Sequence, residues 1–448
     1  MDKARTARIW ISASGMTALV ALYAFWLITE APTYWETFLF VTLLFLLYAA
    51  ALLRFIPYFQ AYISTGSEPH LERVGERTFR RCGVRELAKV ALLIMALRLM
   101  QLLLTYLIRL RVFGYTETFF VAQRLWLDFF HVDRCFPAYP LLSNVFWFFS
   151  FNFNHARFIA SYLFTALAGA ALYYWVLLDF DRTVASHTLL TFFLLPASCL
   201  LLGTTPDGLF LLLSIMCLYF YRKRLFPVAN LFAMGAVCTH LLGALLFVPG
   251  LIEFSQMLIS DLKAHREERS GYLVRQILSA LSFLLIPFGF ALVMLYSSIR
   301  FGNMTALFRA ATEAYGYRAS LPFSAAADVF DRLLNAMHTQ TGAPLLRVLG
   351  SSLADIVYLL GGAALLVVAP GRIRTSYIAY MLVAFPMILC TGTLHEGARL
   401  MSLCVPFVLT LAFLTRSKWV RRGTYLLLAA AHLLYLAAVV CGYAGYGV

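Results

Sequence analysis

The chain has 448 residues, of which 62% are hydrophobic and 13% charged, and its formal net charge is +14. Soluble domains are about half apolar and about a quarter charged, so this composition excludes a soluble globular protein of this length. The Lys and Arg residues lie between apolar segments instead of on one face or tail, which excludes a nucleic-acid-binding protein and is typical of a multi-pass membrane protein.

A series of apolar segments predicts an all-α, polytopic membrane protein, because a backbone in lipid must satisfy its own hydrogen bonds. With about 20 residues needed for each crossing, we expect about twelve or thirteen membrane helices in a single domain over residues 1–448. The segments are 9–29, 36–56, 88–108, 155–178, 187–203, 208–221, 228–258, 273–299, 351–369, 376–392, 399–415 and 424–445.

The basic stretches between these segments predict the cytoplasmic side. They are the N-terminus, 73–89, 221–224, 263–275, 372–374 and 416–422. All of them lie on one side only if 228–258 enters the membrane and returns. A break at Leu242-Gly243 and a proline at position 249 therefore predict a broken helical hairpin, with Thr239, His240 and Gly243 near its apex.

Two long segments, 109–154 and 300–350, then face the non-cytoplasmic side, and long loops of this kind are usually functional. Within the first, Phe136–Leu142 and Phe146–Phe149 predict interfacial amphipathic helices, although an ordinary aromatic belt at a helix end would look similar. The two segments carry Glu117, Asp128, Asp133, Glu313, Asp328 and Asp331.

Two charged residues near or within apolar segments need an explanation. Asp207 lies at the start of a long apolar run, where a charge beside hydrocarbon costs on the order of 3 kcal/mol and marks a candidate functional site. The alternative is a helix N-terminus, where Asp compensates unpaired N–H groups. Arg98 is the main intramembrane cation, and we expect it to snorkel from near a helix end.

Four motifs occur in an order that resembles a known family. The first is Phe136–Leu142 (Phe-Pro-Ala-Tyr-Pro-Leu-Leu). The second is Pro206–Ser214, which continues to Thr239–Gly243 (Thr-His-Leu-Leu-Gly). The third joins Phe301–Asn303 to Tyr317–Pro322, and the fourth joins Glu396–Leu400 to Pro406.

Over about residues 105–445 these motifs resemble the GPI mannosyltransferase II (PIG-V-like) family and its bacterial relatives, within the GT-C membrane glycosyltransferases. The resemblance implies a GT-C-like fold. It also implies transfer of a hexose, mannose first, from a polyprenyl-phosphate donor to a lipid-linked or glycan acceptor on the non-cytoplasmic face. In this chain Asp207 replaces the family's usual Glu, and His240 replaces its usual Arg. The family's Trp-Asp pair in the first external loop has Thr116-Glu117 as its nearest match.

The resemblance assigns roles to six residues. Glu117, followed by Asp128, is the candidate catalytic base, against the alternative of a solvated loop carboxylate. Donor or acceptor binding is expected of Asp207, His240, Arg318 and Arg399. His240 could equally be a core histidine with satisfied hydrogen bonds, and Arg399 could instead snorkel at the interface.

The remaining expectations concern cofactors, partners and alternatives. No metal site is predicted, and a divalent cation, Mg²⁺ or Mn²⁺, is left open as a cofactor. The expected partners are the polyprenyl-phosphate sugar, the acceptor and membrane lipids, with no nucleic acid. We expect a prokaryotic plasma membrane before the endoplasmic reticulum. The rival functions are a lipid or glycan transporter or flippase, and a catalytically inactive relative acting as a binding subunit.

Overall fold

The computed structural model describes most of the chain, and every regular element in this part is a helix. The described residues are 2–30, 32, 34–65, 86, 88–104, 107, 136–150, 153–202, 205–264, 276–309, 319–390, 394 and 397–440. Contacts divide the chain into two compact units. The first unit holds Met1–Ser67, Thr312–Leu411 and Gly442–Val448, and the second holds Glu68–Ala311 and Ala412–Cys441.

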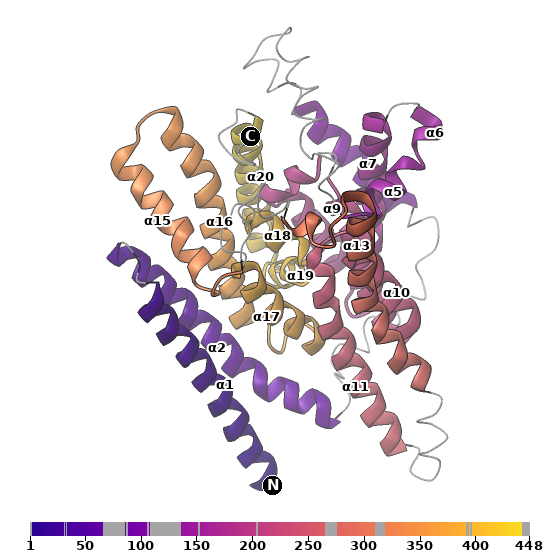
Figure 1. The fold of residues 1–448 in the computed structure, drawn as a ribbon, viewed down its shortest axis with the longest axis vertical. Coiled ribbons are helices and arrows are strands. Elements are labelled where there is room, and N and C mark those ends of the chain that lie inside the picture. The colour runs from indigo at the N-terminus through magenta and orange to yellow at the C-terminus, as the bar shows by residue number, and fades with distance from the viewer. Residues whose placement is uncertain are drawn as a thin grey trace. The chain divides into compact units, whose positions relative to one another are not determined.

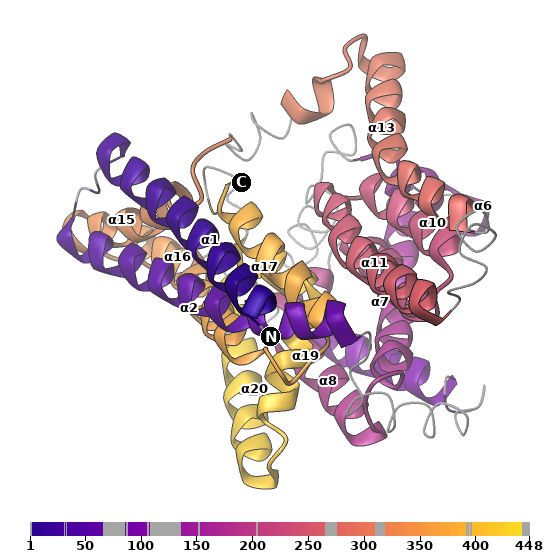
Figure 2. The ribbon, with the colours of Figure 1, turned by 90° about the horizontal axis from the view of Figure 1, so that it is seen from below.

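In the first unit, α2 packs against α1, α15, α16 and α17. Figures 1 and 2 both show α1 and α2 side by side in indigo, with α15 and α16 next to each other in orange. Phe40 of α2 stacks on Phe330 of α15 with 4.6 Å between ring centroids. The helices are α1 (Asp2–Thr29), α2 (Trp35–Thr65), α15 (Ser324–Thr339), α16 (Ala343–Val368), α17 (Thr375–Leu389) and α18 (Gly397–Leu403), followed by α19 (Val405–Leu414).

In the second unit, α9 packs against both α7 and α10. Residues 88–104 are also helical. The other elements are α5 (Ala138–Asn144), α6 (Trp147–Ser150), α7 (Phe153–Val176), α8 (Arg182–Leu194), η2 (Pro196–Leu202), α9 (Asp207–Arg222), α10 (Phe226–Val237), η3 (Leu241–Leu246), α11 (Phe247–Ala264), η4 (Ser282–Leu284), α13 (Leu285–Phe301) and α20 (Lys418–Val440).

The protein is an integral, multi-pass membrane protein. Six of its described helices are long and apolar enough to cross a membrane, and a seventh span is possible if the bent pair α18–α19 counts as one. The expectation of about twelve or thirteen crossings assumed full-length helices throughout. Several of the predicted apolar segments instead form shorter helices, with 13 residues in α8, 16 in α9, 12 in α10 and 15 in α17.

The segment 228–258 forms a helical hairpin. Its break lies at residues 238–240 and not at Leu242-Gly243, where the sequence predicted it, because η3 (Leu241–Leu246) runs directly into α11. Near the break, a Cβ added to Gly243 would lie 2.7 Å from the carbonyl oxygen of Ala236. At the open end, the rings of Phe226 and Phe254 meet edge to face, 5.2 Å apart. The beginning of α10 therefore lies beside α11, and Thr239, His240 and Gly243 lie at the apex.

The segment 300–350 contains more helix than its description as an external loop suggests. Its helix α15 buries Ala325, Val329, Leu333 and Ala336, which recur at helical spacing and face α2 and α16. Helix α16 begins at Ala343, inside the predicted loop. In the segment 109–154, α5 and α6 are both short helices packed on α7, and Leu141 and Phe148 are exposed.

Because Gly243 lies close to the backbone of α10, we expect a side chain at this position to destabilise the hairpin. Gly243→Ala should lower the free energy of unfolding by about 1–3 kcal/mol, because the added methyl group would overlap the backbone of α10. Thermal or denaturant unfolding of the purified protein in detergent measures this loss.

The matched control is Gly235→Ala in α10, where the nearest atom to an added Cβ is a flexible leucine side-chain atom 3.4 Å away. This change should be neutral, or stabilising by up to about 1 kcal/mol through helix propensity. Equal effects of the two substitutions would contradict the hairpin geometry described above.

Candidate functional site

The candidate site in the second unit begins with Asp207, the first residue of α9, whose side chain is 0% exposed. The residue before it is Pro206, whose fixed φ suits a helix start and which has no N–H to leave unpaired. Asp207 therefore lies within the first helical turn, where the positive end of the helix dipole stabilises a carboxylate. Both readings from the sequence, a helix terminus and a functional carboxylate, agree with this position.

Glycine at position 208 lets this end of α9 approach α7 closely. An added Cβ at Gly208 would lie 3.0 Å from the backbone nitrogen of Thr165 and 3.1 Å from the carbonyl oxygen of Ser161. The Ser161 hydroxyl also donates to the carbonyl of Thr205, at 3.4 Å. The backbone on both sides of Asp207 is therefore held by α7, and the carboxylate has a fixed place.

His240 lies beside the same turn of α9. Its ring centroid is 5.3 Å from that of Phe210, which is one helical turn after Asp207. Its Nδ1 accepts a hydrogen bond of 3.1 Å from the backbone N–H of Leu242, so the side chain caps η3. A ring nitrogen that accepts is unprotonated, and the neutral ring then carries its proton on Nε2. The apex of the hairpin thus fixes the orientation of this histidine.

The first motif meets the apex through the backbone. The N–H of Ala138, at the start of α5, donates to the carbonyl of Cys238 at 3.0 Å. This bond satisfies a carbonyl that the break in the hairpin leaves without a helical partner. The segment Phe136–Leu142 is therefore held at the apex by a specific bond.

The chain that follows the first part of the third motif, Phe301–Asn303, meets the same apex. Gly302 ends α13 in the left-handed conformation (φ 70°), which glycine adopts without strain. Asn303 then turns the chain, and its Oδ1 accepts from the N–H of Thr305 at 2.9 Å. The chain that follows packs with Cys238 in a small apolar cluster of Phe136, Ala138, Cys238, Leu292, Val293, Tyr296, Leu307 and Phe308.

The fourth motif belongs to the first unit. Its Arg399 is 4% exposed, so the expectation that it could snorkel at the interface is wrong. All residues of α18 are buried, and Asp355 of α16 accepts a 2.7 Å hydrogen bond from the N–H of Ala398. Pro406, which cannot donate to a helical carbonyl, follows directly on the 80° bend between α18 and α19. Asp355 was missed from the sequence, although it is a carboxylate within an apolar run.

Of the six residues proposed from the sequence, the structure places Asp207 at the start of α9 and His240 against Phe210 in the next turn of that helix, and it buries Arg399 in the first unit. The remaining three, Glu117, Asp128 and Arg318, lie outside the described residues. Within the residues that are described, no three His, Cys, Asp or Glu side chains lie close enough together to hold a metal ion.

The expectation that Arg98 snorkels to the membrane interface is wrong. The side chain stays inside the protein, where it pairs with a backbone carbonyl of a neighbouring segment. Arg98 is 1% exposed and donates through Nη2 to the carbonyl of Leu201. Pro196 ends α8 early, which leaves carbonyl groups of this segment without helical partners. Side chains from 88–104 and from α20 reach these carbonyls, as backbone groups in an apolar environment require.

Gln101 and His432 complete this arrangement. The Gln101 amide donates to the carbonyl of Phe193 at 3.4 Å, and Nδ1 of His432 is 3.0 Å from the carbonyl oxygen of Leu195. The two side chains also meet each other, with 3.3 Å between Nε2 of each. We therefore interpret Arg98, Gln101 and His432 as partners of a broken backbone.

Comparisons with models of protein families, with curated proteins and with solved structures gave no match to this chain.

If His432 donates to the carbonyl of Leu195, removing its imidazole should lower the free energy of unfolding. His432→Leu should cost about 0.5–1.5 kcal/mol, the net value of one hydrogen bond, because the carbonyl of Leu195 still accepts from the N–H and the hydroxyl of Ser198. His432→Asn, whose amide can donate from a similar position, should retain most of that stability. Unfolding of both variants in detergent tests this, and equal losses would show that the hydrogen bond is unimportant.

Proposed function

We propose that this protein is a GT-C-type membrane glycosyltransferase. It transfers a hexose, mannose before glucose, from a polyprenyl-phosphate donor to the hydroxyl of a lipid-linked or glycan acceptor on the non-cytoplasmic face. The observation that carries the proposal is that the first two family-like motifs, and the chain after the first part of the third, meet at the apex of one broken hairpin. There Ala138 of α5 bonds to Cys238, Phe210 of α9 lies against His240, and Leu307 and Phe308 pack with Cys238.

The chemistry needs few groups, and the residues of this chain offer each of them. A carboxylate within hydrogen-bond reach takes the proton of the acceptor hydroxyl and contributes roughly 10²–10⁴-fold. We assign this role to Glu117, with Asp128 as the alternative. The sugar passes through an oxocarbenium-like transition state, and the departing phosphate gathers negative charge. Within the second unit, we assign the stabilisation of that charge to His240.

Asp207 suits a binding role better than that of the base. Its carboxylate is buried at a fixed place in the first turn of α9, so it can accept hydrogen bonds from sugar hydroxyls. The exposed apolar side chains of the neighbouring short helices, Leu141 (61%) and Phe148 (70%), offer a surface for the polyprenyl chain. A lipid tail and a sugar would thus be held on adjoining parts of one unit.

The test is an assay of the purified full-length protein with radiolabelled polyprenyl-phosphate-mannose and polyprenyl-phosphate-glucose, with and without Mg²⁺ or Mn²⁺. Transfer from either donor supports the proposal. Donor binding without transfer by the wild type would instead indicate an inactive relative that acts as a binding subunit. Movement of the lipid-linked sugar across liposomes without transfer would indicate a flippase.

Glu117→Gln should reduce kcat by at least about 10², because the acceptor proton then has no carboxylate to receive it. The amide is nearly isosteric, so donor binding should change little, and a loss of kcat at constant donor affinity marks a transition-state role. If Glu117→Gln is active and Asp128→Asn is not, the base is Asp128. Full activity of both variants would show that the catalytic base does not lie in the first external segment.

Asp207→Asn should mainly raise KM, by about 10-fold or more, because a hydrogen bond to a charged group is lost in the ground state as well as in the transition state. The matched control is Asp261→Asn in α11, where a partly exposed carboxylate pairs with Arg224 at 3.6 Å. That change should leave kcat and KM within about twofold, since exposed ion pairs contribute little. If Asp207→Asn leaves kcat and KM unchanged but lowers the unfolding temperature, Asp207 stabilises the helix N-terminus and does not bind substrate.

A further inference from the structure

A second polar site lies in the second unit between α8 and α20. It is an open pocket of about 480 Å³, lined by Arg182, Thr183, Ser186, His187, Leu190, Arg421 and Tyr425. These residues take no part in the proposed transfer reaction. The lining combines cationic and hydroxyl groups with one apolar side chain, which is the chemistry that recognises a phosphate group attached to an apolar molecule.

His187 joins the two walls of the pocket. Its Nδ1 lies 2.5 Å from the hydroxyl of Tyr425 in α20, and its Nε2 lies 2.8 Å from the hydroxyl of Thr415. The ring is 3% exposed, so both bonds form in a largely dry environment. The distance between α8 and α20 is therefore fixed, and the pocket is preformed.

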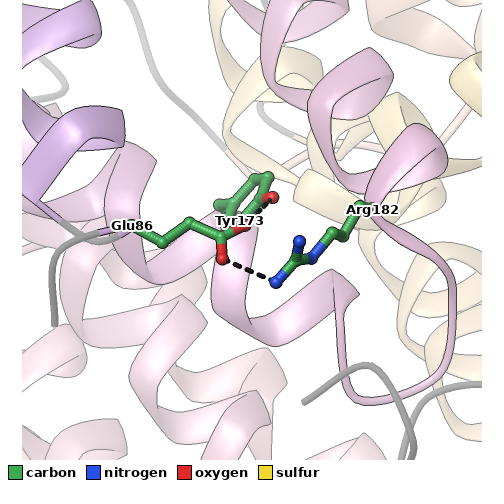
Figure 3. A network of polar contacts seen from close by, with 3 residues as sticks. All are labelled: Glu86, Tyr173 and Arg182. Carbon is green, nitrogen blue, oxygen red and sulfur yellow. Dashed lines mark hydrogen bonds and ion pairs between the residues drawn. The ribbon is translucent and has the colours of Figure 1, made fainter. Parts of the chain in front are cut away.

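The two arginines of the pocket, Arg182 and Arg421, differ in whether a carboxylate binds them. Figure 3 shows Arg182 reaching the carboxylate of Glu86, at 2.8 Å, while the hydroxyl of Tyr173 donates to the same carboxylate, also at 2.8 Å. This network holds Arg182 in one orientation. Arg421, in contrast, makes no ion pair with any carboxylate in the described part of the chain. Its positive charge is thus available to an anion.

Asp181, which precedes Arg182 in the sequence, is already engaged. Asp181 caps α8 by accepting from the N–H of Val184 at 2.9 Å, and it lies 3.6 Å from a guanidinium nitrogen of Arg416. The sequence of α20 contains no Asp or Glu at all. The electrostatic balance at the mouth of the pocket is therefore positive.

The position of the pocket points to a membrane lipid as the source of the anion. Arg421 and Tyr425 lie in the first turns of α20, a candidate membrane span. Trp419 in the same turns is 79% exposed, as is usual for an aromatic side chain at the membrane interface. Further along α20, Leu426 and Leu427 are 75% and 70% exposed, so an apolar surface continues from the pocket into the bilayer.

We infer that this pocket binds the phosphate headgroup of an anionic phospholipid, with Arg421 as its principal cation. The headgroup contacts Arg421, Ser186 and Tyr425, and the acyl chains lie along the exposed leucines of α20. Pockets for drug-sized ligands measure roughly 300–1,000 Å³, so this volume suits a whole headgroup better than phosphate alone. The basic segment 416–422 predicts the cytoplasmic leaflet as the source of the lipid.

The experiment uses the full chain, purified in a neutral detergent, and three probes: dihexanoyl phosphatidylglycerol, dihexanoyl phosphatidylcholine and inorganic phosphate. The shift of the unfolding temperature with probe concentration gives each Kd. Phosphatidylglycerol should bind saturably, and the other two should bind at least about tenfold more weakly. Equal binding of phosphatidylcholine would overturn the role of the negative charge. Equal binding of inorganic phosphate would overturn the assignment to a lipid.

Arg421→Gln should raise the Kd for phosphatidylglycerol by about tenfold or more, because it removes a charge-assisted hydrogen bond to the phosphate. The matched control is Arg422→Gln, which removes the same charge one residue away. Arg422 lies over the ring of Trp419, 5.6 Å from its centroid, and does not line the pocket. The control should stay within about twofold of the wild type.

Equal weakening by the two arginine substitutions would show attraction to a general positive surface and overturn the site. Ser186→Ala provides a second variant at an exposed position of α8 that does not depend on charge. It should raise the Kd a few-fold, by about the value of one neutral hydrogen bond. An unchanged Kd in both Ser186→Ala and Arg421→Gln would also overturn the site.

Discussion

The constraint on which this structure depends is that a backbone in apolar surroundings must find a partner for each N–H and C=O group. Continuous helices meet it by themselves, but this chain breaks its helices repeatedly. At Pro196 the carbonyls of the broken segment take donors from Arg98, Gln101 and His432. Each of these polar side chains therefore has a backbone carbonyl as a partner inside the protein.

At the break in the hairpin apex, the unpaired backbone groups find a different kind of partner. The carbonyl of Cys238 takes its donor from the backbone of Ala138, and His240 caps the next turn. Because the partner here is another loop and not a long side chain, closing the break brings distant parts of the chain together. The same requirement that allows the hairpin to exist therefore assembles the candidate site around it.

The sequence allowed the helical class and the main helices to be predicted, because apolar runs and their basic flanks report the membrane directly. A break within 228–258 was also predictable, because that run is too long for one membrane helix, although the break falls at residues 238–240 and not at Leu242-Gly243. The burial of Arg98 was not, because it depends on the carbonyl of Leu201, near the end of η2 and about a hundred residues away in the chain. Likewise, no spacing rule relates Phe136 to Phe308, whose rings meet only through the tertiary fold.

Two buried carboxylates, Asp355 and Asp207, lie at helix N-termini, but in different ways. Asp355 caps the N-terminus of another helix through the N–H of Ala398, which accounts for its place. Asp207 lies at the start of its own helix, where the dipole contributes typically 0.3–1 kcal/mol and up to about 2 kcal/mol when partly buried. Placing a carboxylate in apolar surroundings costs on the order of 3 kcal/mol. The dipole therefore offsets part of this cost, and the close packing of α9 against α7 at Gly208 holds the carboxylate where the dipole acts. Position 207 thus suits both a helix terminus and the binding role proposed for this carboxylate.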